Sequence, residues 1–447
     1  SLENRMRFLT EIIRSAQQKA GKDYVLMCRI SGEEFMEGGM TLKETAPMAV
    51  AMERAGIQAL DVQAGWHESP VPLVQMSVPR GAFVYVAEGI KKAVKIPVAA
   101  AYRISDPLLA EQILVEGKAD LIGMGRALIA DPDLPNKARE GNIEDIRTCI
   151  ACNHCLDQIF EEKPVACAIN AQTGHEAEYA IVPASKPKMV VVVGGGPAGL
   201  EAARVAALRG HRVTIMEQGE KLGGNLLVAA IPPHKEEIAC FTSYLTAQVK
   251  KLGISVKLGT LVTAQAVLAQ KPQAVIVAAG GSPLIPDIPG ARGKNVVTAM
   301  DVLTGKAKTG QRVVMVGGGM VGCETAEVLA AQGKEITILE MLPRLGADIG
   351  ASHRWVVTGR LRKANIKMEA GAKAEEITEK GVRATREGQS LFFEGDTVVL
   401  AVGMKANGGL AQELQGKVEE LHVIGDCTQP RRITQAVEEG MKAGLAL

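Results

Sequence analysis

Half of the eight cysteines lie in one short stretch, residues 148–167, and this stretch constrains the chain more than any other. Three fall within seven residues and a fourth follows after a gap, in the spacing C-x2-C-x2-C-x11-C: Cys149, Cys152, Cys155 and Cys167. Three closely spaced thiolates and one from a returning segment can surround a cubane, so the pattern predicts a [4Fe-4S] cluster. A zinc site is the weaker alternative, because zinc usually binds two separated C-x2-C pairs, and ordinary thiols are a third.

The length, charge and hydropathy of the chain limit the number of domains, the kinds of partner and the cellular setting that we expect. A chain of 447 residues is too long for one core and predicts roughly three domains. The net charge is +1, and no run of lysine and arginine suggests a nucleic-acid or membrane-surface partner. No apolar run is long enough to span a bilayer, and eight cysteines without a secretory segment favour a reducing, cytoplasmic setting. The chain opens at Ser1 inside a helical pattern, so we expect further sequence upstream.

Residues 1–147 alternate between apolar strands and helical patterns. Strands are expected at 24–29, 59–62, 97–101 and 120–124. This alternation predicts a parallel sheet covered by helices, which would be either half of an eight-stranded barrel or a small open sheet. Helix starts are marked by a capping box at Thr41 and Glu44 and by Asp106 followed by Pro107.

Polar residues near the strand ends favour the half-barrel. Barrel active sites are built at the carboxyl ends of the strands, and four residues are expected there, one for each strand: Arg29, His67, Arg103 and Arg126. Barrels typically bind phosphate after their last two strands, where this sequence has Ala101 before Arg103 and Gly125 before Arg126. A guanidinium offers two N–H groups to phosphate oxygens, so these residues predict a phosphate site, with ordinary surface polar groups as the alternative.

Residues 188–447 contain two copies of a glycine-rich pattern. Each copy places G-x-G-x-x-G between an apolar strand and a helix, and each ends its next strand in a glutamate at the same spacing. The two sets are Gly194, Gly196, Gly199 with Glu217, and Gly317, Gly319, Gly322 with Glu340. The pattern predicts two Rossmann units, in which a pyrophosphate lies at the helix N-terminus and the glutamate accepts a hydrogen bond from a ribose hydroxyl.

The glutamate of the second copy also indicates which nucleotide binds there. A carboxylate repels the 2′-phosphate of NADPH, so Glu340 favours NADH. Arg344 lies close in the sequence and leaves NADPH as the weaker alternative.

Three further apolar strands, at 274–281, 397–403 and 421–426, indicate how the two copies are nested. With them the chain resembles flavoprotein reductases that contain two dinucleotide-binding domains. By this resemblance residues 188–305 and 396–447 bind FAD, residues 306–395 are inserted and bind the nicotinamide nucleotide, and residues 148–187 form the cluster segment and linker. The resemblance also places Gly425 and Asp426 at the FAD ribityl chain and Gly224 and Asn225 near the flavin. A turn-forming aspartate is the alternative for Asp426.

The first 147 residues also resemble a known family when their motifs are taken together. S-L-E-N-R, C-R-I-S, G-W-H-E, V-P-R-G-A-F, R-I-S-D-P and G-M-G-R-A-L-I-A-D-P are similar to the C-terminal half of the barrel in old-yellow-enzyme-like NADH:flavin oxidoreductases. The greatest likeness is to the iron–sulfur members: 2,4-dienoyl-CoA reductase, 2-enoate reductase and trimethylamine dehydrogenase. The implied fold is α/β, with the C-terminal half of a TIM (β/α)8 barrel, a [4Fe-4S] segment and two nested Rossmann-like domains.

This second resemblance implies an FMN site on the barrel. It makes Arg29 an isoalloxazine contact and places Arg103, Gly125 and Arg126 at the FMN phosphate. It also matches His67 with the active-site histidine that stabilises the enolate formed from the substrate. The first four barrel units of the family, with their proton-donating tyrosine, have no counterpart in this chain, so we expect a missing N-terminal half-barrel.

The implied activity is NADH-dependent reduction of an activated C=C bond in an enoyl-CoA, dienoyl-CoA or enoate. Hydride would pass from NADH to FAD, single electrons would cross the [4Fe-4S] cluster, and reduced FMN would deliver hydride to the β-carbon. Two alternatives are an amine dehydrogenase of the trimethylamine dehydrogenase type and a module that oxidises NADH to reduce an external acceptor. The expected partner is a small-molecule substrate, and a homo-oligomer is left open.

Overall fold

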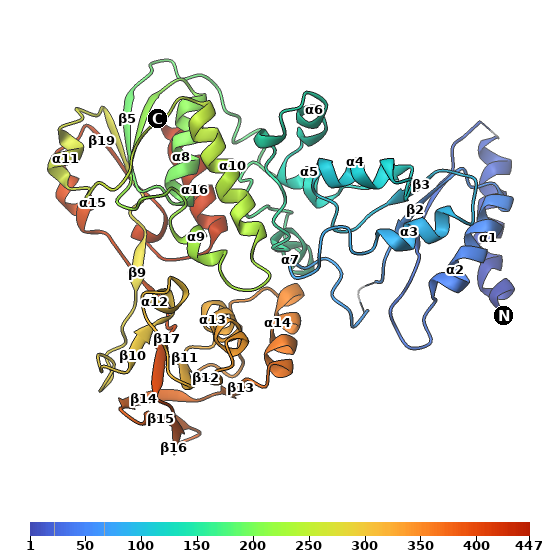
Figure 1. Ribbon diagram of the computed structural model, residues 1–447. Helices are drawn as coiled ribbons and strands as arrows, with labels where there is room; N and C mark the ends of the chain where they lie inside the picture. Colours follow the sequence, from blue (N-terminus) through green and yellow to red (C-terminus); the bar gives the residue numbers. More distant parts are fainter. Residues whose placement is uncertain (22, 67) are drawn as a thin grey trace. The chain divides into compact units, whose positions relative to one another are not determined.

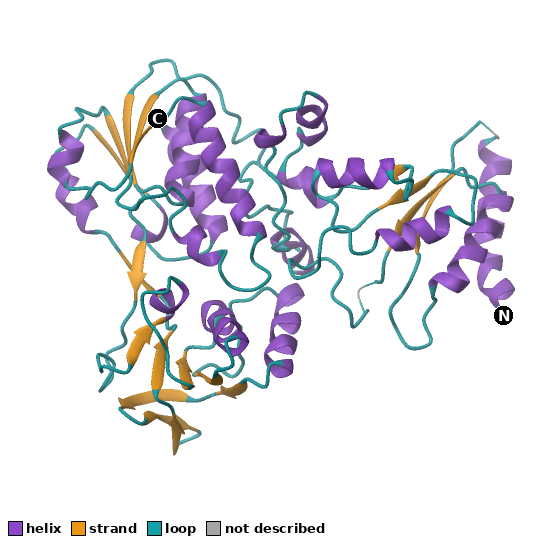
Figure 2. Ribbon diagram, in the orientation of Figure 1, coloured by secondary structure: helices purple, strands orange, loops and turns teal. Residues whose placement is uncertain are grey.

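The computed structural model describes residues 1–21, 23–66 and 68–447, which form two compact units, Ser1–Ala151 and Cys152–Leu447 (Figure 1). Each unit is an α/β structure in which helices cover parallel sheets (Figure 2). No helix in the described ranges combines the length and the apolar character needed to cross a membrane.

The first unit is built on a four-stranded parallel sheet whose strand order follows the sequence, β1-β2-β3-β4. The strands are β1 (Met27–Ser31), β2 (Ala59–Gln63), β3 (Val98–Ala100) and β4 (Leu121–Ile122). Parallel neighbours need a crossover connection, and helices supply it between successive strands. Consecutive parallel strands alternating with helices are the arrangement of one half of a (β/α)8 barrel, as predicted.

The helices of the first unit begin where the sequence marks them. Thr41 and Glu44 form the predicted capping box, and the Asp106 carboxylate accepts a hydrogen bond from the Leu108 N–H at 2.9 Å. The core beneath the helices contains buried Ile13 and Met52. The helices are α1 (Leu2–Ala20), α2 (Leu42–Ala55), α3 (Val84–Lys91), α4 (Pro107–Val115), α5 (Arg126–Ala130), α6 (Leu134–Arg139) and the 3-10 helix η1 (Ile143–Asp145).

The second unit begins with α7 (His154–Phe160) and contains a five-stranded parallel sheet in the order β19-β8-β5-β6-β7. Its strands are β5 (Met189–Val193), β6 (Arg212–Met216), β7 (Ser255–Lys257), β8 (Ala274–Val277) and β19 (Glu420–Val423). The helices around it are α8 (Pro197–Leu208), α9 (Asn225–Ala229), α10 (Glu237–Lys251), α11 (Ala264–Leu268), α15 (Gly409–Leu414), η2 (Gly425–Cys427) and α16 (Ile433–Ala446).

A second parallel sheet in this unit has the order β10-β17-β11-β12-β13. Its strands are β10 (Val296–Thr298), β11 (Arg312–Val316), β12 (Glu335–Glu340), β13 (Lys367–Ala370) and β17 (Thr397–Leu400). Its helices are α12 (Ala299–Leu303), α13 (Met320–Ala331) and α14 (Ala351–Lys363), and an antiparallel sheet of β14 (Lys373–Thr378), β15 (Gly381–Arg386) and β16 (Gln389–Glu394) lies between β13 and β17 in the chain.

The boundaries predicted for the inserted domain, residues 306–395, are too narrow. The second sheet also contains β10 and β17, which the sequence assigned to the first domain. A short run of apolar residues predicts a buried strand, but its pairing partner depends on where the chain crosses over. The chain leaves the first sheet and returns to it through β9 (Gly281–Pro283) and β18 (Met404–Ala406), which pair antiparallel with each other.

Two glycines allow α16 to pack closely against α8. A Cβ atom on Gly440 would lie 2.5 Å from the carbonyl oxygen of Ala198, and one on Gly444 would lie 2.6 Å from the Cβ of Val205. Carbon atoms in contact normally stay at least about 3.5 Å apart, so neither position can carry a side chain without moving the helix.

A buried ionic cluster connects α13 with its surroundings. The Lys235 ammonium lies 2.6 Å from a carboxylate oxygen of Glu324, and the Arg360 guanidinium donates to both carboxylate oxygens of Glu327 at 2.6 and 2.9 Å. His353 on α14 is only 8% exposed, and burial, with the nearby charges of Lys235 and Arg360, lowers its pKa to about 3. His353 is therefore neutral in the folded protein at any ordinary pH.

The helix contact predicts opposite effects for two glycine substitutions. Gly444→Ala should lower the free energy of unfolding by about 1–3 kcal/mol, because the added methyl group forces α16 away from α8. Gly359→Ala on α14 should raise it by roughly 0.5–1 kcal/mol, because a Cβ there meets nothing within 4 Å and alanine favours a helix. Urea denaturation followed by circular dichroism measures both, and equal midpoints for the two variants would contradict the close packing.

The buried histidine predicts a pH dependence of stability. Below the unfolded pKa of about 6.5 the unfolded chain binds a proton at His353 that the folded chain does not bind, so acid destabilises the fold between about pH 6.5 and pH 3. When the pH falls from about 7.5 to about 5, the free energy of unfolding of the unsubstituted protein should decrease. For His353→Gln this decrease should be smaller by roughly 2 kcal/mol. Urea midpoints at both pH values test this, with the exposed His175→Gln as the control that should keep the original dependence.

Candidate functional site

The first glycine loop joins β5 to α8 and approaches the neighbouring backbone so closely that side chains are excluded. Gly194 has φ 105°, and a Cβ there would lie 2.2 Å from the Ala278 carbonyl oxygen. A Cβ on Gly199 would lie 2.0 Å from the Gly194 carbonyl oxygen. At Gly196 the nearest atom, the Cα of Gly224, would be 4.0 Å away. The loop is therefore tight on its inner side and accessible at Gly196, as a dinucleotide pyrophosphate requires.

The second glycine loop joins β11 to α13 and repeats this geometry. Gly317 also has φ 105°, and its Cβ would lie 2.4 Å from the Ala401 carbonyl oxygen. A Cβ on Gly322 would lie 1.9 Å from the carbonyl oxygen of Gly317. At Gly319 the nearest atom would be a carboxylate oxygen of Asp348, at 3.2 Å.

The two strand-end glutamates hold the glycine loops directly. Glu217 accepts hydrogen bonds from the backbone N–H groups of Gly195 and Gly219, each at 2.6 Å. Glu340, which is 8% exposed, accepts from Gly318 at 2.7 Å and from Leu342 at 2.8 Å. Each carboxylate oxygen has a second lone pair, so these bonds leave acceptor capacity for ribose hydroxyls.

The other residues predicted near the flavin of the first domain lie at the start of α9 and in η2. Gly224 has φ 51°, and its Cβ would lie 2.9 Å from the Cα of Gly196, while Asn225 begins α9. Gly425 has φ 71° and opens η2. Burial raises the pKa of Asp426, whose carboxylate accepts a hydrogen bond from the Arg431 N–H at 3.0 Å. The turn-forming role is therefore present, and the ribityl contact of Asp426 stays a prediction.

In the first unit, the expectation that Arg29 lies at or past a strand end is wrong. Arg29 is in the middle of β1, because the strand continues to Ser31, and it pairs in register with Asp61 of β2. Its guanidinium lies 2.6 Å from a carboxylate oxygen of Asp61, and its side chain is 66% exposed. The other oxygen of Asp61 is buried and has no hydrogen bond within the described residues. The pair therefore combines an exposed cation with a buried acceptor that has no hydrogen bond within the described residues.

Arg103 and Arg126 follow the ends of β3 and β4, as predicted. The Arg103 side chain is buried and donates to the Val78 carbonyl oxygen at 2.8 Å, and Arg126 donates to that of Val74 at 2.8 Å. Both arginines therefore hold the loop that precedes α3.

Small residues were predicted beside both arginines, Ala101 before Arg103 and Gly125 before Arg126. Ala101 lies close to the neighbouring backbone, and the backbone at Gly125 is open. A Cβ atom built on Gly123 would lie 3.3 Å from the Cβ of Ala101, its nearest contact. A Cβ on Gly125 would meet nothing within 4 Å, so the backbone there is accessible. Binding of a phosphate by this region stays a prediction.

Sequence reasoning assigned no role to Tyr102, which the structure places among the charged residues of this sheet. Its φ is 73°, and its ring packs edge-on against Phe83 with ring centroids 6.3 Å apart. Burial raises the pKa of Tyr102, while the neighbouring charges of Arg29 and Arg126 oppose that shift. Its place directly after an apolar strand, in A-Y-R, was the available signal. His67, the predicted catalytic residue, lies outside the described residues.

The four predicted cluster cysteines are all half-buried. In the first unit, the Ala151 N–H donates to the Cys149 sulfur at 3.4 Å, and Ala151 has φ 49°. N–H donors to thiolate sulfur are typical of iron–sulfur sites. The second unit contains the other three, Cys152, Cys155 and Cys167. Within the ranges that the structure describes, no three or more His, Cys, Asp or Glu side chains are grouped to hold a metal ion, so cluster ligation stays a prediction.

The remaining cysteines, Cys28, Cys240, Cys323 and Cys427, are buried or half-buried thiols, as expected. Burial raises the pKa of Cys323 to about 12, which makes this thiol unreactive.

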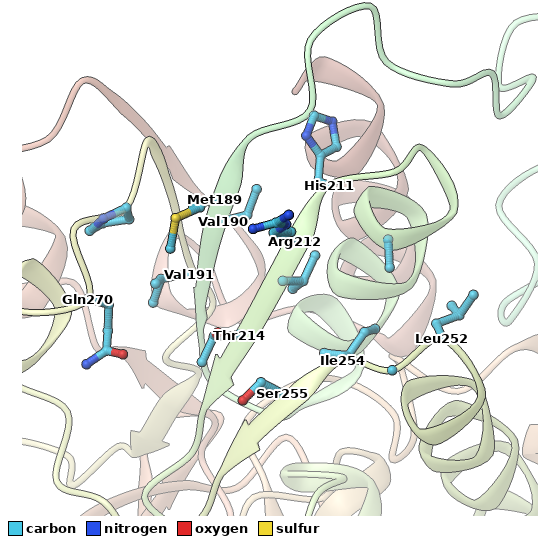
Figure 3. Close-up of a pocket in the computed structure, with 14 residues that line it drawn as sticks. Met189, Val190, Val191, His211, Arg212, Thr214, Leu252, Ile254, Ser255 and Gln270 are labelled. Atoms are coloured by element: carbon cyan, nitrogen blue, oxygen red, sulfur yellow. The ribbon is translucent and has the colours of Figure 1, made fainter.

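A cavity of about 430 Å³ in the second unit is not the dinucleotide site. Figure 3 shows that its lining includes Met189, Arg212 and Ser255, the first residues of β5, β6 and β7. The glycine loop follows the opposite, carboxyl end of β5, where ligands of open α/β sheets bind.

Comparison with known proteins supports this division of the chain. Residues 188–440 match the pyridine nucleotide-disulphide oxidoreductase family, and residues 1–145 match the NADH:flavin oxidoreductase / NADH oxidase family. A metal reductase of Desulforamulus reducens is 42% identical over 98% of this chain and 71% of its own length. A cinnamate reductase of Clostridium sporogenes is 32% identical over 98% of this chain and 68% of its own length.

A solved structure extends the similarity to three dimensions. The structure of 2-naphthoyl-CoA reductase in complex with 2-naphthoyl-CoA matches 100% of this chain and 69% of its own, with a TM-score of 0.97 and 38% identity. Because both family models and these relatives agree with the half-barrel and the two glycine-loop domains, the chain belongs to the NADH:flavin oxidoreductase / NADH oxidase family, in the branch that also carries a pyridine nucleotide-disulphide oxidoreductase module.

Proposed function

We propose that this protein is an NADH-dependent flavin oxidoreductase that reduces the activated C=C bond of an enoyl-CoA, a dienoyl-CoA or an enoate. The observation that carries the proposal is the presence, in one chain, of two glutamate-held dinucleotide loops and a half-barrel with an exposed arginine on its sheet. Relatives named cinnamate reductase and 2-naphthoyl-CoA reductase support the substrate class. The expected partner is therefore a small molecule. We further expect the protein to act in the cytoplasm.

The cofactors are assigned to residues that fit them. Gly194, Gly196, Gly199 and Glu217 would hold FAD, with Gly224, Asn225, Gly425 and Asp426 near the flavin and ribityl chain. Gly317, Gly319, Gly322 and Glu340 would hold NADH. Arg29 would contact FMN, with Ala101, Arg103, Gly125 and Arg126 at its phosphate, and the four cysteines would hold [4Fe-4S]. When bound, these groups supply hydride transfer at the nicotinamide and flavins and single-electron transfer at the cluster.

The side chains of this protein would bind and orient these groups and the substrate. Glu340, fixed by two backbone N–H groups, would place its negative charge beside the ribose carbon that carries the 2′-phosphate of NADPH, and would so favour NADH. Arg29, oriented by Asp61, would present its positive charge to the isoalloxazine ring of FMN. His67 would donate a hydrogen bond to the substrate carbonyl and stabilise the negative charge that develops on its oxygen.

A second candidate function is the reduction of an external acceptor by the electrons that NADH supplies. The relative named metal reductase favours this candidate. It would use the dinucleotide domains and the cluster and would not require the half-barrel to bind FMN.

Cofactor analysis combined with one cysteine substitution tests the proposal. The purified protein should contain FMN, FAD, iron and acid-labile sulfide, and should oxidise NADH anaerobically when cinnamate or an enoyl-CoA is added. Cys155→Ser should lose iron and sulfide and slow alkene reduction by roughly 100-fold, because loss of a ligand disrupts the cluster. Cys240→Ser, outside the cysteine stretch, is the matched control. FAD without FMN, with reduction of ferric citrate alone, would favour the second candidate.

The two strand-end glutamates predict separable effects on the two dinucleotides. Glu340→Gln should raise the Kd of NADH about tenfold, because its amide cannot accept from both backbone N–H groups and a ribose. Glu217→Gln should instead lower the FAD content per chain and leave the Kd of NADH unchanged. Each variant is the control of the other. If both substitutions changed the same cofactor, the assignment of FAD to the first loop and NADH to the second would be wrong.

A further inference from the structure

The similarity of the two dinucleotide units continues beyond their glycines and glutamates. Leu222 packs near Gly195 in the first unit as Leu345 packs near Gly318 in the second. The carbonyl oxygen of Gly195 accepts a hydrogen bond from the Gly223 N–H at 2.7 Å, and that of Gly318 accepts from Gly346 at 2.7 Å. The spacing between corresponding residues is constant along this stretch. Two residues beyond these glycines, the first unit has the neutral Asn225, whereas the second has the acidic Asp348.

The Asp348 carboxylate lies at the N-terminus of α13. The N–H of Met320, the first residue of that helix, donates to both carboxylate oxygens, at 2.9 and 3.1 Å. The same carboxylate would be the nearest contact of a Cβ on Gly319. In the first unit, Pro197 takes the position of Met320 and has no N–H to donate. A carboxylate of the protein itself, that of Asp348, therefore accepts a hydrogen bond at the glycine loop of the second unit.

The segment that carries Asp348 is fixed from several sides. The Arg432 guanidinium donates to the backbone carbonyl oxygen of Asp348, and Arg432 lies in the loop that also contains Asp426. Just beyond Asp348, the Asp157 carboxylate of α7 accepts from the Ser352 N–H at 3.0 Å, at the start of α14. The position of Asp348 thus depends on contacts with the segment that contains Asp426 and with α7, the helix that carries the predicted cluster ligand Cys155.

The N-terminus of a helix attracts negative charge because its N–H groups are unpaired and its dipole is positive there. A dinucleotide in a Rossmann unit places its pyrophosphate at this position. A carboxylate and a pyrophosphate cannot both accept from the Met320 N–H, and their like charges repel each other. Because Asp348 is exposed, its side chain can leave the helix without disturbing a core.

We propose that Asp348 sets the nucleotide affinity of the second unit, since its carboxylate takes the place at α13 that the pyrophosphate of NADH needs. This inference rests on the proposed function, in which the second loop binds NADH. NADH binds by displacing Asp348, and the return of the carboxylate to Met320 helps the oxidised nucleotide to leave. The residue lowers affinity, in contrast to the glycines and Glu340, which support binding.

The inference is tested by exchanging the two corresponding residues. Asp348→Asn gives the second unit the residue of the first, and an asparagine oxygen can still accept from the Met320 N–H, so the cap of α13 is kept. The Kd of NADH, measured by fluorescence on the FAD-loaded protein, should fall about tenfold, and inorganic pyrophosphate should compete at correspondingly lower concentration. Asn225→Asp, the reciprocal change, should lower FAD retention. Asp287 is an exposed aspartate elsewhere in the same unit, and Asp287→Asn should change neither the Kd of NADH nor the retention of FAD.

The outcomes separate the inference from the function on which it rests. If the unsubstituted protein retained FAD but bound no NADH, the proposed role of the second loop would be wrong. If both the unsubstituted protein and Asp348→Asn bound NADH with the same Kd, or if the variant bound more weakly, the inference about Asp348 would be overturned and the proposed function would stand. A lower Kd together with unchanged FAD content and an unchanged melting temperature supports the inference.

Discussion

The close approach of helix to strand at the two glycine loops is the constraint on which the rest of the second unit depends. At Gly199 and Gly322 the helix backbone lies so near the preceding loop carbonyl that a methyl group would overlap it. This contact aims the first turn of each helix at the carboxyl edge of its sheet. Once the helices are held in this way, the positive ends of α8 and α13 become anion sites without any basic side chain.

The strand-end glutamates then determine what kind of anion fits. Glu217 and Glu340 have both carboxylate oxygens engaged by backbone N–H groups, so their charges are held in place beside the loops. A fixed negative charge accepts hydroxyl groups and repels phosphate. Nearby, the second loop also carries the Asp348 carboxylate, which the first loop lacks. The two loops are therefore similar in shape and different in charge.

In the half-barrel, the arginines predicted to contact a ligand also make contacts within the protein. Arginines near strand ends suggest ligand contacts, yet Arg103 and Arg126 each bind a backbone carbonyl of a neighbouring loop. Arg29 is paired with Asp61 on the adjacent strand, although its side chain is mostly exposed. Because a buried or half-buried guanidinium must satisfy several N–H groups, the protein uses part of Arg103 and of Arg126 internally. The cationic surface left for a ligand is smaller than a count of arginines indicates.

The sequence by itself determined the two Rossmann units, the helix caps and the parallel character of both units, because each depends on local spacing: glycine to glutamate, cap residue to first turn, strand to crossover helix. Only the tertiary structure decided that β10 and β17 join the second sheet and that Arg29 pairs with Asp61. It alone also decided that Tyr102 lies near the charges of Arg29 and Arg126, and that the Asp348 carboxylate reaches the N-terminus of α13. These contacts join residues distant in the sequence, and periodicity carries no information about which distant backbone or charge a side chain will meet.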